Sequence, residues 1–241
     1  MVERGADGIG RLLAESVRET LWPTRCAVCD APGRVLCEAC DARLEALDLW
    51  QACPTCGAPW GRIQCDHCTP VVAHGAAVRL CVAALRYEGA AAVVIRTYKD
   101  KGEQRLAETL ARRLADAIFP SWWTWADAVT YVRATDAARR RRGFDHVELI
   151  ARSLAETAGL PCLTLLSAPK ARDQRTLGRR ARRDNVGGRF EAAHDALACG
   201  DGPRRVILVD DVMTTGATLD DAARALEAAG YAVRAACVAR A

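Results

Sequence analysis

The segment from Val206 to Thr218 reads V-I-L-V-D-D-V-M-T-T-G-A-T and constrains the fold of this chain more than any other stretch. Its four leading apolar residues form a short continuous run of the kind that makes a fully buried strand. Two adjacent carboxylates, Asp210 and Asp211, follow that run, and the next helix is predicted to begin near Thr218. Open α/β sheets bind their ligands at the carboxyl ends of the strands, which is where this pattern places the carboxylates.

The segment after the carboxylates is a turn that consists of Thr214, Thr215, Gly216, Ala217 and Thr218. A turn that leads into a helix presents free backbone N–H groups beside the positive end of the helix dipole, and this combination binds anions. The neighbouring carboxylates are suited to hydroxyl groups or to a metal ion. Together the two features predict a site for a sugar phosphate.

Apolar strand patterns alternate with amphipathic helix patterns along the rest of the chain, which predicts a mainly parallel sheet flanked by helices. We expect strands over residues 128–132, 163–166, 206–209 and 233–238, with a further strand or hairpin within 76–87. We expect helices over residues 11–22, 41–50, 90–98, 105–119, 147–158 and 218–229, and loops over 99–102 and 136–146.

A cysteine-rich region lies between residues 23 and 72 and contains four C-x-x-C pairs. Two thiolates separated by two residues can reach one tetrahedral ion, and four thiolates make a closed structural zinc site. We therefore predict two structural zinc ions, held by Cys26, Cys29, Cys37, Cys40, Cys53, Cys56, Cys65 and Cys68. A redox dithiol module is the weaker interpretation, because it calls for one such pair near a βαβ pattern.

Each C-x-x-C pair forms one zinc knuckle, and the four knuckles can be combined into two zinc sites in two ways. Consecutive pairing gives two four-cysteine sites along the chain, whereas cross-braced pairing joins the first knuckle to the third. We prefer consecutive pairing because residues 41–50 resemble a helix that separates two compact knuckle pairs. His67 lies inside the last knuckle and is interpreted as a bystander, since four cysteines already complete that site.

Composition narrows the class of protein. An apolar fraction of 51% excludes a disordered chain, and no apolar run is long enough for a transmembrane helix. The first 21 residues lack the apolar core of a secretory signal, so we expect a cytoplasmic protein. The net charge of +4 is uneven: positive charge gathers in residues 133–146 and 170–189, and such patches attract phosphates, pyrophosphate or nucleic acid.

The segment from Val206 to Thr218 resembles the phosphoribosyl pyrophosphate (PRPP) signature of type I phosphoribosyltransferases. The whole chain resembles the ComF family, whose members join an N-terminal cysteine zinc module to a phosphoribosyltransferase body and are linked to competence for DNA uptake. The residues that carry this second resemblance are the cysteine knuckles, Tyr98-Lys99 with Gly102, Arg142-Gly143-Phe144-Asp145, Gln174, Arg182, Asn185 and the PRPP loop. It implies a helix over 1–22, a zinc module over 23–72 and a phosphoribosyltransferase-like domain over 73–241.

The resemblance also implies a function. Asp210 and Asp211 would bind the ribose hydroxyls and carry catalysis, the Thr214–Thr218 loop would hold the 5′-phosphate, and Lys99 and Arg142 would contact pyrophosphate. Catalysis would be Mg²⁺-dependent transfer of a phosphoribosyl group to an unidentified acceptor. The alternative is a non-catalytic protein that handles single-stranded DNA, using the transferase fold as a scaffold or PRPP sensor. Competence-machinery proteins are further candidate partners.

One departure from the family pattern concerns the pyrophosphate loop. In related transferases the turn after the second strand forms this loop, and it usually contains Pro. Here the corresponding segment, from Val132 to Thr135, has none. Ligand binding is therefore better supported by the sequence than turnover.

Overall fold

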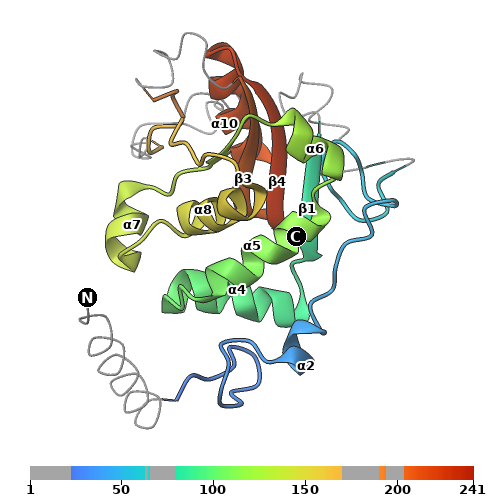
Figure 1. Ribbon diagram of the computed structural model, residues 1–241, viewed down its shortest axis with the longest axis vertical. Helices are drawn as coiled ribbons and strands as arrows, with labels where there is room; N and C mark the ends of the chain where they lie inside the picture. The colour runs from blue at the N-terminus through green and yellow to red at the C-terminus, as the bar shows by residue number, and fades with distance from the viewer. Residues whose placement is uncertain (1–22, 63–64, 66–79, 170–189, 194–203) are drawn as a thin grey trace, which may run out of the picture.

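The computed structural model describes residues 23–62, 65, 80–169, 190–193 and 204–241. Within these residues four parallel strands form one sheet in the order β1-β4-β3-β2 (Figure 1). The strands are β1 (Cys81–Arg86), β2 (Ala128–Tyr131), β3 (Arg205–Met213) and β4 (Ala232–Arg240). The predicted parallel α/β sheet is therefore confirmed.

Helices cover both faces of the sheet. Three of them share one face and lie side by side in Figure 1: α4 (Gly89–Lys101), α5 (Leu106–Ala117) and α8 (His146–Ala158). Helix α10 (Ala217–Ala228) packs on the opposite face against β3 and β4. Because neighbouring strand residues point to opposite faces, β3 contributes side chains to the cores on both sides of the sheet. Val209 belongs to the core under α4, α5 and α8, and Leu208 belongs to the core under α10.

Two segments predicted as loops are helical. Helix α4 continues through Lys99 to Lys101 and ends at Gly102, whose φ of 76° places it in the left-handed region that commonly follows a helix. Residues 136–142 form α7 (Asp136–Arg142) instead of a loop. The Thr135 hydroxyl accepts a hydrogen bond from the Ala138 N–H, and the four Arg residues at the end of α7 lie where the helix dipole favours cations.

The expected helix over residues 41–50 is wrong. The last turn of the second C-x-x-C pair forms the short helix α2 (Glu38–Asp41). Residues 42–44 then form a turn and a bend, and residues 45–47 run along β1. Ala46 bridges antiparallel to Leu85, and the Leu47 N–H donates to the Ala84 carbonyl oxygen. This segment thus covers the free edge of β1, which would otherwise present unpaired backbone groups.

One helix was not predicted, and one predicted strand is absent. Pro120 begins a helix, α6 (Pro120–Trp125), in addition to following the end of α5. Pro is well tolerated at the first helical position because its missing N–H has no partner there. Residues 163–166 form no strand; Cys162 bridges to Val129 and Leu166 to Ala192, so only single bridges flank this segment.

Several predictions lie outside the described residues. These are the helix over 1–22, the boundary near residue 72, His67, Cys68, and the basic segment 170–189 with Gln174, Arg182 and Asn185. The three-part domain division therefore stays a prediction. None of the helices in the described part of the chain is long and apolar enough to span a bilayer.

Candidate functional site

Asp210 and Asp211 lie within β3 near its carboxyl end, because the strand continues past them to Met213. Both carboxylates are buried, with exposed fractions of 7% and 6%. The alternation along β3 places Asp210 on the same face as Leu208, toward α10, and Asp211 on the same face as Val209, toward α4 and α8. The two carboxylates therefore serve opposite sides of the sheet edge.

Asp211 is held by two cationic or donor groups from different helices. The Lys99 Nζ of α4 lies 2.5 Å from its Oδ2 atom, and the His146 Nε2 of α8 lies 3.1 Å from the same atom. Burial alone would raise the pKa of Asp211, but the hydrogen bond from His146 and the Lys99 charge outweigh burial and lower it well below the ordinary value. Asp211 is thus a fixed, ionised carboxylate.

Asp210 has the opposite electrostatic environment. Its Oδ1 accepts a hydrogen bond of 2.8 Å from the Asp211 N–H. Burial and the negative charge of Asp211 raise the pKa of Asp210 well above the ordinary value. A cation that approached this carboxylate would relieve both effects, which is the behaviour expected of a ligand for a bound metal.

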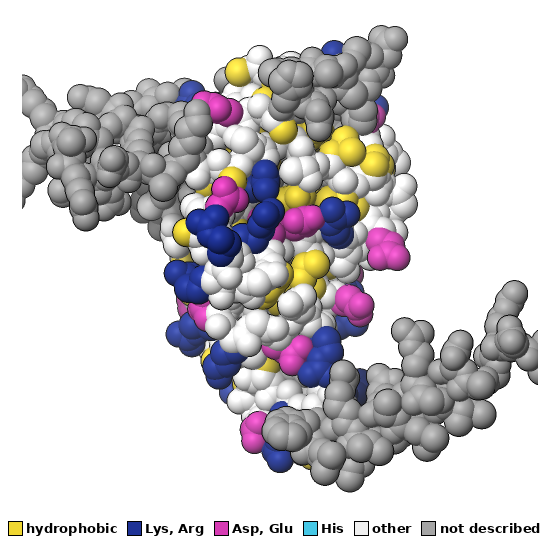
Figure 2. Space-filling model, turned by 90° about the vertical axis from the view of Figure 1, so that its left-hand side faces the viewer, with side chains coloured by type: hydrophobic (Ala, Val, Ile, Leu, Met, Phe, Trp, Pro, Cys, Tyr) yellow, Lys and Arg dark blue, Asp and Glu magenta, His cyan; other side chains and the backbone are white. Residues whose placement is uncertain are grey.

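Arg142 differs from the other arginines of α7. Residues 139–141 are exposed, whereas the Arg142 side chain is only 11% exposed. Its Nη1 lies 3.2 Å from the His146 Nδ1, and its Nη2 lies 3.7 Å from a carboxylate oxygen of Asp100. Figure 2 shows Lys and Arg side chains interspersed with carboxylates on the side of the molecule where α7 lies. His146 therefore lies between Arg142 and Asp211 and contacts both of them.

Asp145 organises the turn that follows β2. Its Oδ1 accepts a hydrogen bond from the Val147 N–H and caps α8, while its Oδ2 accepts one of 2.9 Å from the Ala134 N–H. The Val132 N–H also donates to the Val209 carbonyl oxygen of β3. The turn without Pro is consequently anchored on both sides, next to the carboxyl end of β3.

The phosphate-binding loop predicted from sequence forms a turn over Thr214–Gly216, and α10 begins at Ala217, one residue before the predicted start. Gly216 has a φ of 80°, and a Cβ built on it would lie 2.6 Å from the Met213 Cε. An L-residue would therefore be strained by its backbone conformation and would also displace Met213. The positive φ is the main reason for Gly at this position, because Met213 Cε is the end of a flexible side chain that can move aside.

Gly216→Ala is expected to lower the free energy of unfolding by about 1 kcal/mol or more and to weaken phosphate binding by the loop. Gly159→Ala is the matched control, because Gly159 also has positive φ, 66°, but a Cβ there meets nothing within 4 Å. Thermal unfolding of both variants separates the backbone cost from the displacement of Met213. Equal destabilisation of the two variants would show that the Met213 contact is unimportant.

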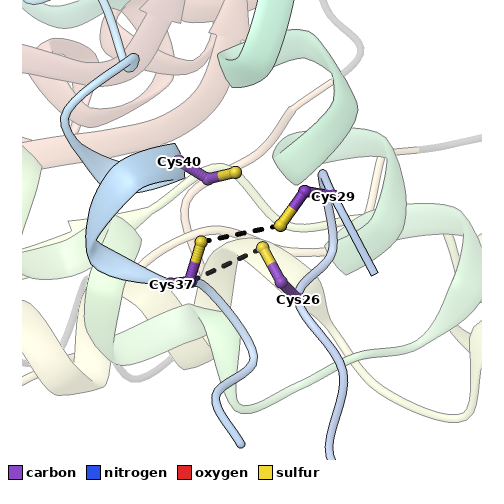
Figure 3. Close-up of side chains that lie close together, drawn as sticks. All are labelled: Cys26, Cys29, Cys37 and Cys40. Carbon is purple, nitrogen blue, oxygen red and sulfur yellow. Dashed lines mark hydrogen bonds between the residues drawn. The ribbon is translucent and has the colours of Figure 1, made fainter. Parts of the chain in front are cut away.

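Four cysteine sulfurs converge at the start of the described chain. Cys26, Cys29, Cys37 and Cys40 have Sγ atoms that all lie within 4.8 Å of one another (Figure 3). Cys29 and Cys37 sulfurs are 3.6 Å apart, and the Cys37 N–H points to the Cys26 Sγ at 3.5 Å. This geometry agrees with consecutive pairing of the first two knuckles.

The electrostatic environment of these four thiols favours a bound cation. Burial would raise the pKa of Cys26, but backbone N–H groups of Cys29, Cys37 and Val28 lower it to about 6. Burial and the neighbouring sulfurs raise the pKa of Cys40 to about 12, because thiolates this close repel one another. A divalent ion between them would remove that repulsion, so the donor set fits structural zinc.

A second group contains Cys53, Cys56 and Cys65, whose sulfurs also lie within 4.8 Å of one another. Its predicted fourth ligand, Cys68, is outside the described residues. In the described part of the chain, these two cysteine groups are the only sets of three or more His, Cys, Asp or Glu side chains close enough to share an ion. A Mg²⁺ ion at β3 would thus need oxygens from its substrate in addition to a carboxylate, as is usual for Mg²⁺.

His146 was not predicted as a site residue from the sequence. The residue follows directly after the Arg142–Asp145 motif, so its position next to a recognised segment was the available signal. Its contact with Asp211 joins two parts of the chain that are distant in sequence, and only the parallel sheet brings them together.

Comparisons with known proteins agree with this architecture. Residues 201–241, which contain β3, α10 and β4, match the phosphoribosyl transferase domain family model. Together with the parallel sheet, this match defines the class: an α/β protein of the phosphoribosyltransferase fold with an N-terminal cysteine cluster.

The more particular comparison concerns most of the chain. It is 26% identical over 204 residues to Competence protein F of Haemophilus influenzae, covering 81% of this chain and 85% of that one. It is 27% identical over 195 residues to Competence protein ComFC of Streptococcus pneumoniae, and this match covers 81% of this chain and 82% of that one. The ComF resemblance predicted from the sequence is thereby confirmed.

Solved structures give weaker matches. Orotate phosphoribosyltransferase from Aeropyrum pernix is 22% identical with a TM-score of 0.33, over 58% of this chain and 60% of that chain. Glutamine PRPP amidotransferase from B. subtilis is 23% identical with a TM-score of 0.37, over 56% of this chain and 26% of that chain.

Proposed function

We propose that this protein binds PRPP with Mg²⁺ at the carboxyl end of β3 and transfers its phosphoribosyl group to an acceptor. The observation that carries the proposal is the cluster around Asp211, where a buried carboxylate meets Lys99 and His146 beside a turn that leads into α10. Ligands of open α/β sheets bind at this edge. The names of the competence-protein relatives suggest a role in DNA uptake, and cysteine-ligated zinc suits a reducing cytoplasm.

Residues on the two faces of the sheet would contact different parts of PRPP. On the α10 side, backbone N–H groups of the Thr214–Thr218 loop and the start of α10 would hold the 5′-phosphate. On the other side, Lys99 and Arg142 would face the pyrophosphate, whose departure leaves developing negative charge that fixed cations stabilise. Asp210 and Asp211 would bind the ribose hydroxyls between them, and Mg²⁺ would supply Lewis-acid stabilisation of the leaving group.

Calorimetric titration with PRPP tests this proposal. Wild-type protein is expected to bind PRPP in the presence of Mg²⁺ and much more weakly after its removal with a chelator. Replacing both carboxylates, Asp210→Asn with Asp211→Asn, should abolish binding, because the double variant removes the ligands for hydroxyls and metal. Unchanged affinity in the double variant would sink the proposal.

The single-stranded DNA alternative has less support. The most basic segment, 170–189, lies outside the described residues, and the face near α7 mixes both signs of charge. A purely electrostatic DNA contact predicts affinity that falls steeply with salt. Titration of a labelled oligonucleotide at two salt concentrations distinguishes this function from PRPP binding, which depends on the carboxylates.

A further inference from the structure

His146 occupies a position between the two parts of the proposed site. Its side chain is 5% exposed and lies at the start of α8. The Nε2 atom is 3.1 Å from the Asp211 Oδ2, and the Nδ1 atom is 3.2 Å from the Arg142 Nη1. The backbone is held as well, because the Tyr98 hydroxyl donates to the His146 carbonyl oxygen at 2.5 Å.

The chemistry of these partners determines the protonation of the ring. A guanidinium group has N–H donors and no acceptor, so the Nδ1 atom that faces Arg142 must be the acceptor. The ring proton then resides on Nε2, where it is donated to the carboxylate of Asp211. We infer that His146 is a positioning residue that acts in its neutral, Nε2-protonated form and links Arg142 to Asp211; this inference rests on the proposed function.

The hydrogen bonds that the Asp211 carboxylate already accepts limit what else it can bind. Its Oδ2 atom receives Lys99 and His146, and its Oδ1 atom accepts a hydrogen bond of 2.7 Å from the Val212 N–H. A carboxylate has about four acceptor positions, and these contacts occupy three of them; the fourth is within reach of the Asp210 carboxyl, which also interacts with the Asp211 side chain, or of a ligand hydroxyl. His146 therefore orients the carboxylate so that Oδ1 is presented to a ribose hydroxyl.

Arg142 contributes to this orientation through His146. If the ring carried its proton on Nδ1 instead, the Nε2 lone pair would face the negatively charged Asp211 and repel it. The Arg142 guanidinium opposes that tautomer because its own N–H points at Nδ1. The residue proposed to contact pyrophosphate thus also fixes the carboxylate proposed to bind the ribose, and the two ends of the ligand are recognised by one connected set of side chains.

Two substitutions separate this role from a merely structural one. The amide of His146→Gln can donate to Asp211 and accept from Arg142, so it reproduces the neutral donor–acceptor pattern. His146→Leu has a similar volume but makes neither hydrogen bond. We expect PRPP affinity within about threefold of wild type for His146→Gln and at least about tenfold weaker for His146→Leu, as for the loss of a buried hydrogen bond to a charged group.

Nitrogen-15 NMR of the full-length wild-type protein tests the tautomer without any ligand. The chain has four His, so the His146 signals are assigned as those that disappear in His146→Gln. A protonated Nε2 with an unprotonated Nδ1 is the expected result, and protonated Nδ1 would overturn the inference. Equal PRPP affinity of wild type and His146→Leu would also overturn the inference. If the wild-type protein does not bind PRPP at all, the proposed function is overturned, and the NMR experiment still tests the tautomer of His146.

Discussion

Replacing the two adjacent carboxylates one at a time is expected to change stability in opposite directions. Asp210→Asn should raise the free energy of unfolding at neutral pH by about 1 kcal/mol or more. Asp211→Asn should lower it by about 2 kcal/mol or more, because it breaks buried hydrogen bonds to a charged group. Neighbouring residues of one strand thus give opposite results because they face different sides of the sheet.

The expectation for Asp210 follows from its raised pKa, which burial and the charge of Asp211 cause. The folded protein binds this proton more tightly than the unfolded chain does. Stability therefore falls as the pH rises from the ordinary Asp pKa, near 4, toward the folded value. Asn is neutral at every pH and retains an oxygen that can accept the hydrogen bond from the Asp211 N–H.

The expectation for Asp211 has the reverse sign. Its pKa is lowered in the folded protein, because the contacts with His146 and Lys99 outweigh burial. Its stabilising contribution is therefore complete above the ordinary Asp pKa and is lost as the pH falls below about 4. Asp211→Asn leaves the Lys99 ammonium, which is 30% exposed in the wild type, without its carboxylate partner.

Urea unfolding of both variants and wild type, without PRPP or divalent ions, measures these effects at pH 7 and pH 5. The gain from Asp210→Asn should shrink at the lower pH, because the wild-type carboxyl is then closer to neutral in both states. Loss of stability in both variants would contradict the assignment of opposite environments to the two carboxylates.

Removing one ligand from the first cysteine group is expected to have the second large effect. Wild-type protein should contain about two Zn²⁺ per chain, and Cys26→Ser should contain about one. Cys26 is buried, and it belongs to the same apolar core as Leu36, Leu44 and residues of α4 and α5. Loss of the ion should therefore destabilise the packing between the cysteine region and the helices.

Structural contacts outside the sulfurs indicate what would be lost with the ion. The Arg113 side chain of α5 forms an ion pair of 2.6 Å with Asp41, which directly follows the last cysteine of the group. The extended segment after α2 also covers the edge of β1. Zinc binding contributes roughly 10 kcal/mol or more to the folding of small cysteine sites, so we expect these contacts to weaken when the ion is lost.

Elemental analysis and thermal unfolding of Cys26→Ser test this prediction. Cys162→Ser is the control, because Cys162 lies outside both cysteine groups. The control should retain the wild-type metal content. Full zinc occupancy in Cys26→Ser, or one zinc per chain in the wild type, would show that the eight cysteines do not form two complete sites.

The sequence was sufficient for features that depend on local patterns. The strand over 206–209, the carboxylates, the Thr/Gly turn and the first cysteine group each depend on spacing within a short segment, and the structure contains all of them. The α7 helix was missed because its Arg run has no apolar stripe, although Thr135 and Gly143 supplied helix boundaries.

Features that depend on tertiary contacts were not predictable. Residues 45–47 are extended because they pair with the edge of β1, a partner that local propensity does not reveal. The opposite orientation of Asp210 and Asp211 follows from strand alternation, but it required knowing that β3 continues to Met213. The contact between His146 and Asp211 required the packing of α8 on the sheet.

The most direct test of the central claim is calorimetric titration of Asp210→Asn with PRPP and Mg²⁺. This variant is expected to be at least as stable as wild type, so lost binding cannot be attributed to unfolding. PRPP binding at β3 predicts that the variant remains folded and binds at least about tenfold more weakly than wild type, as for the loss of a charge-assisted contact. Wild-type affinity in this folded variant would contradict a PRPP site at the carboxyl end of β3.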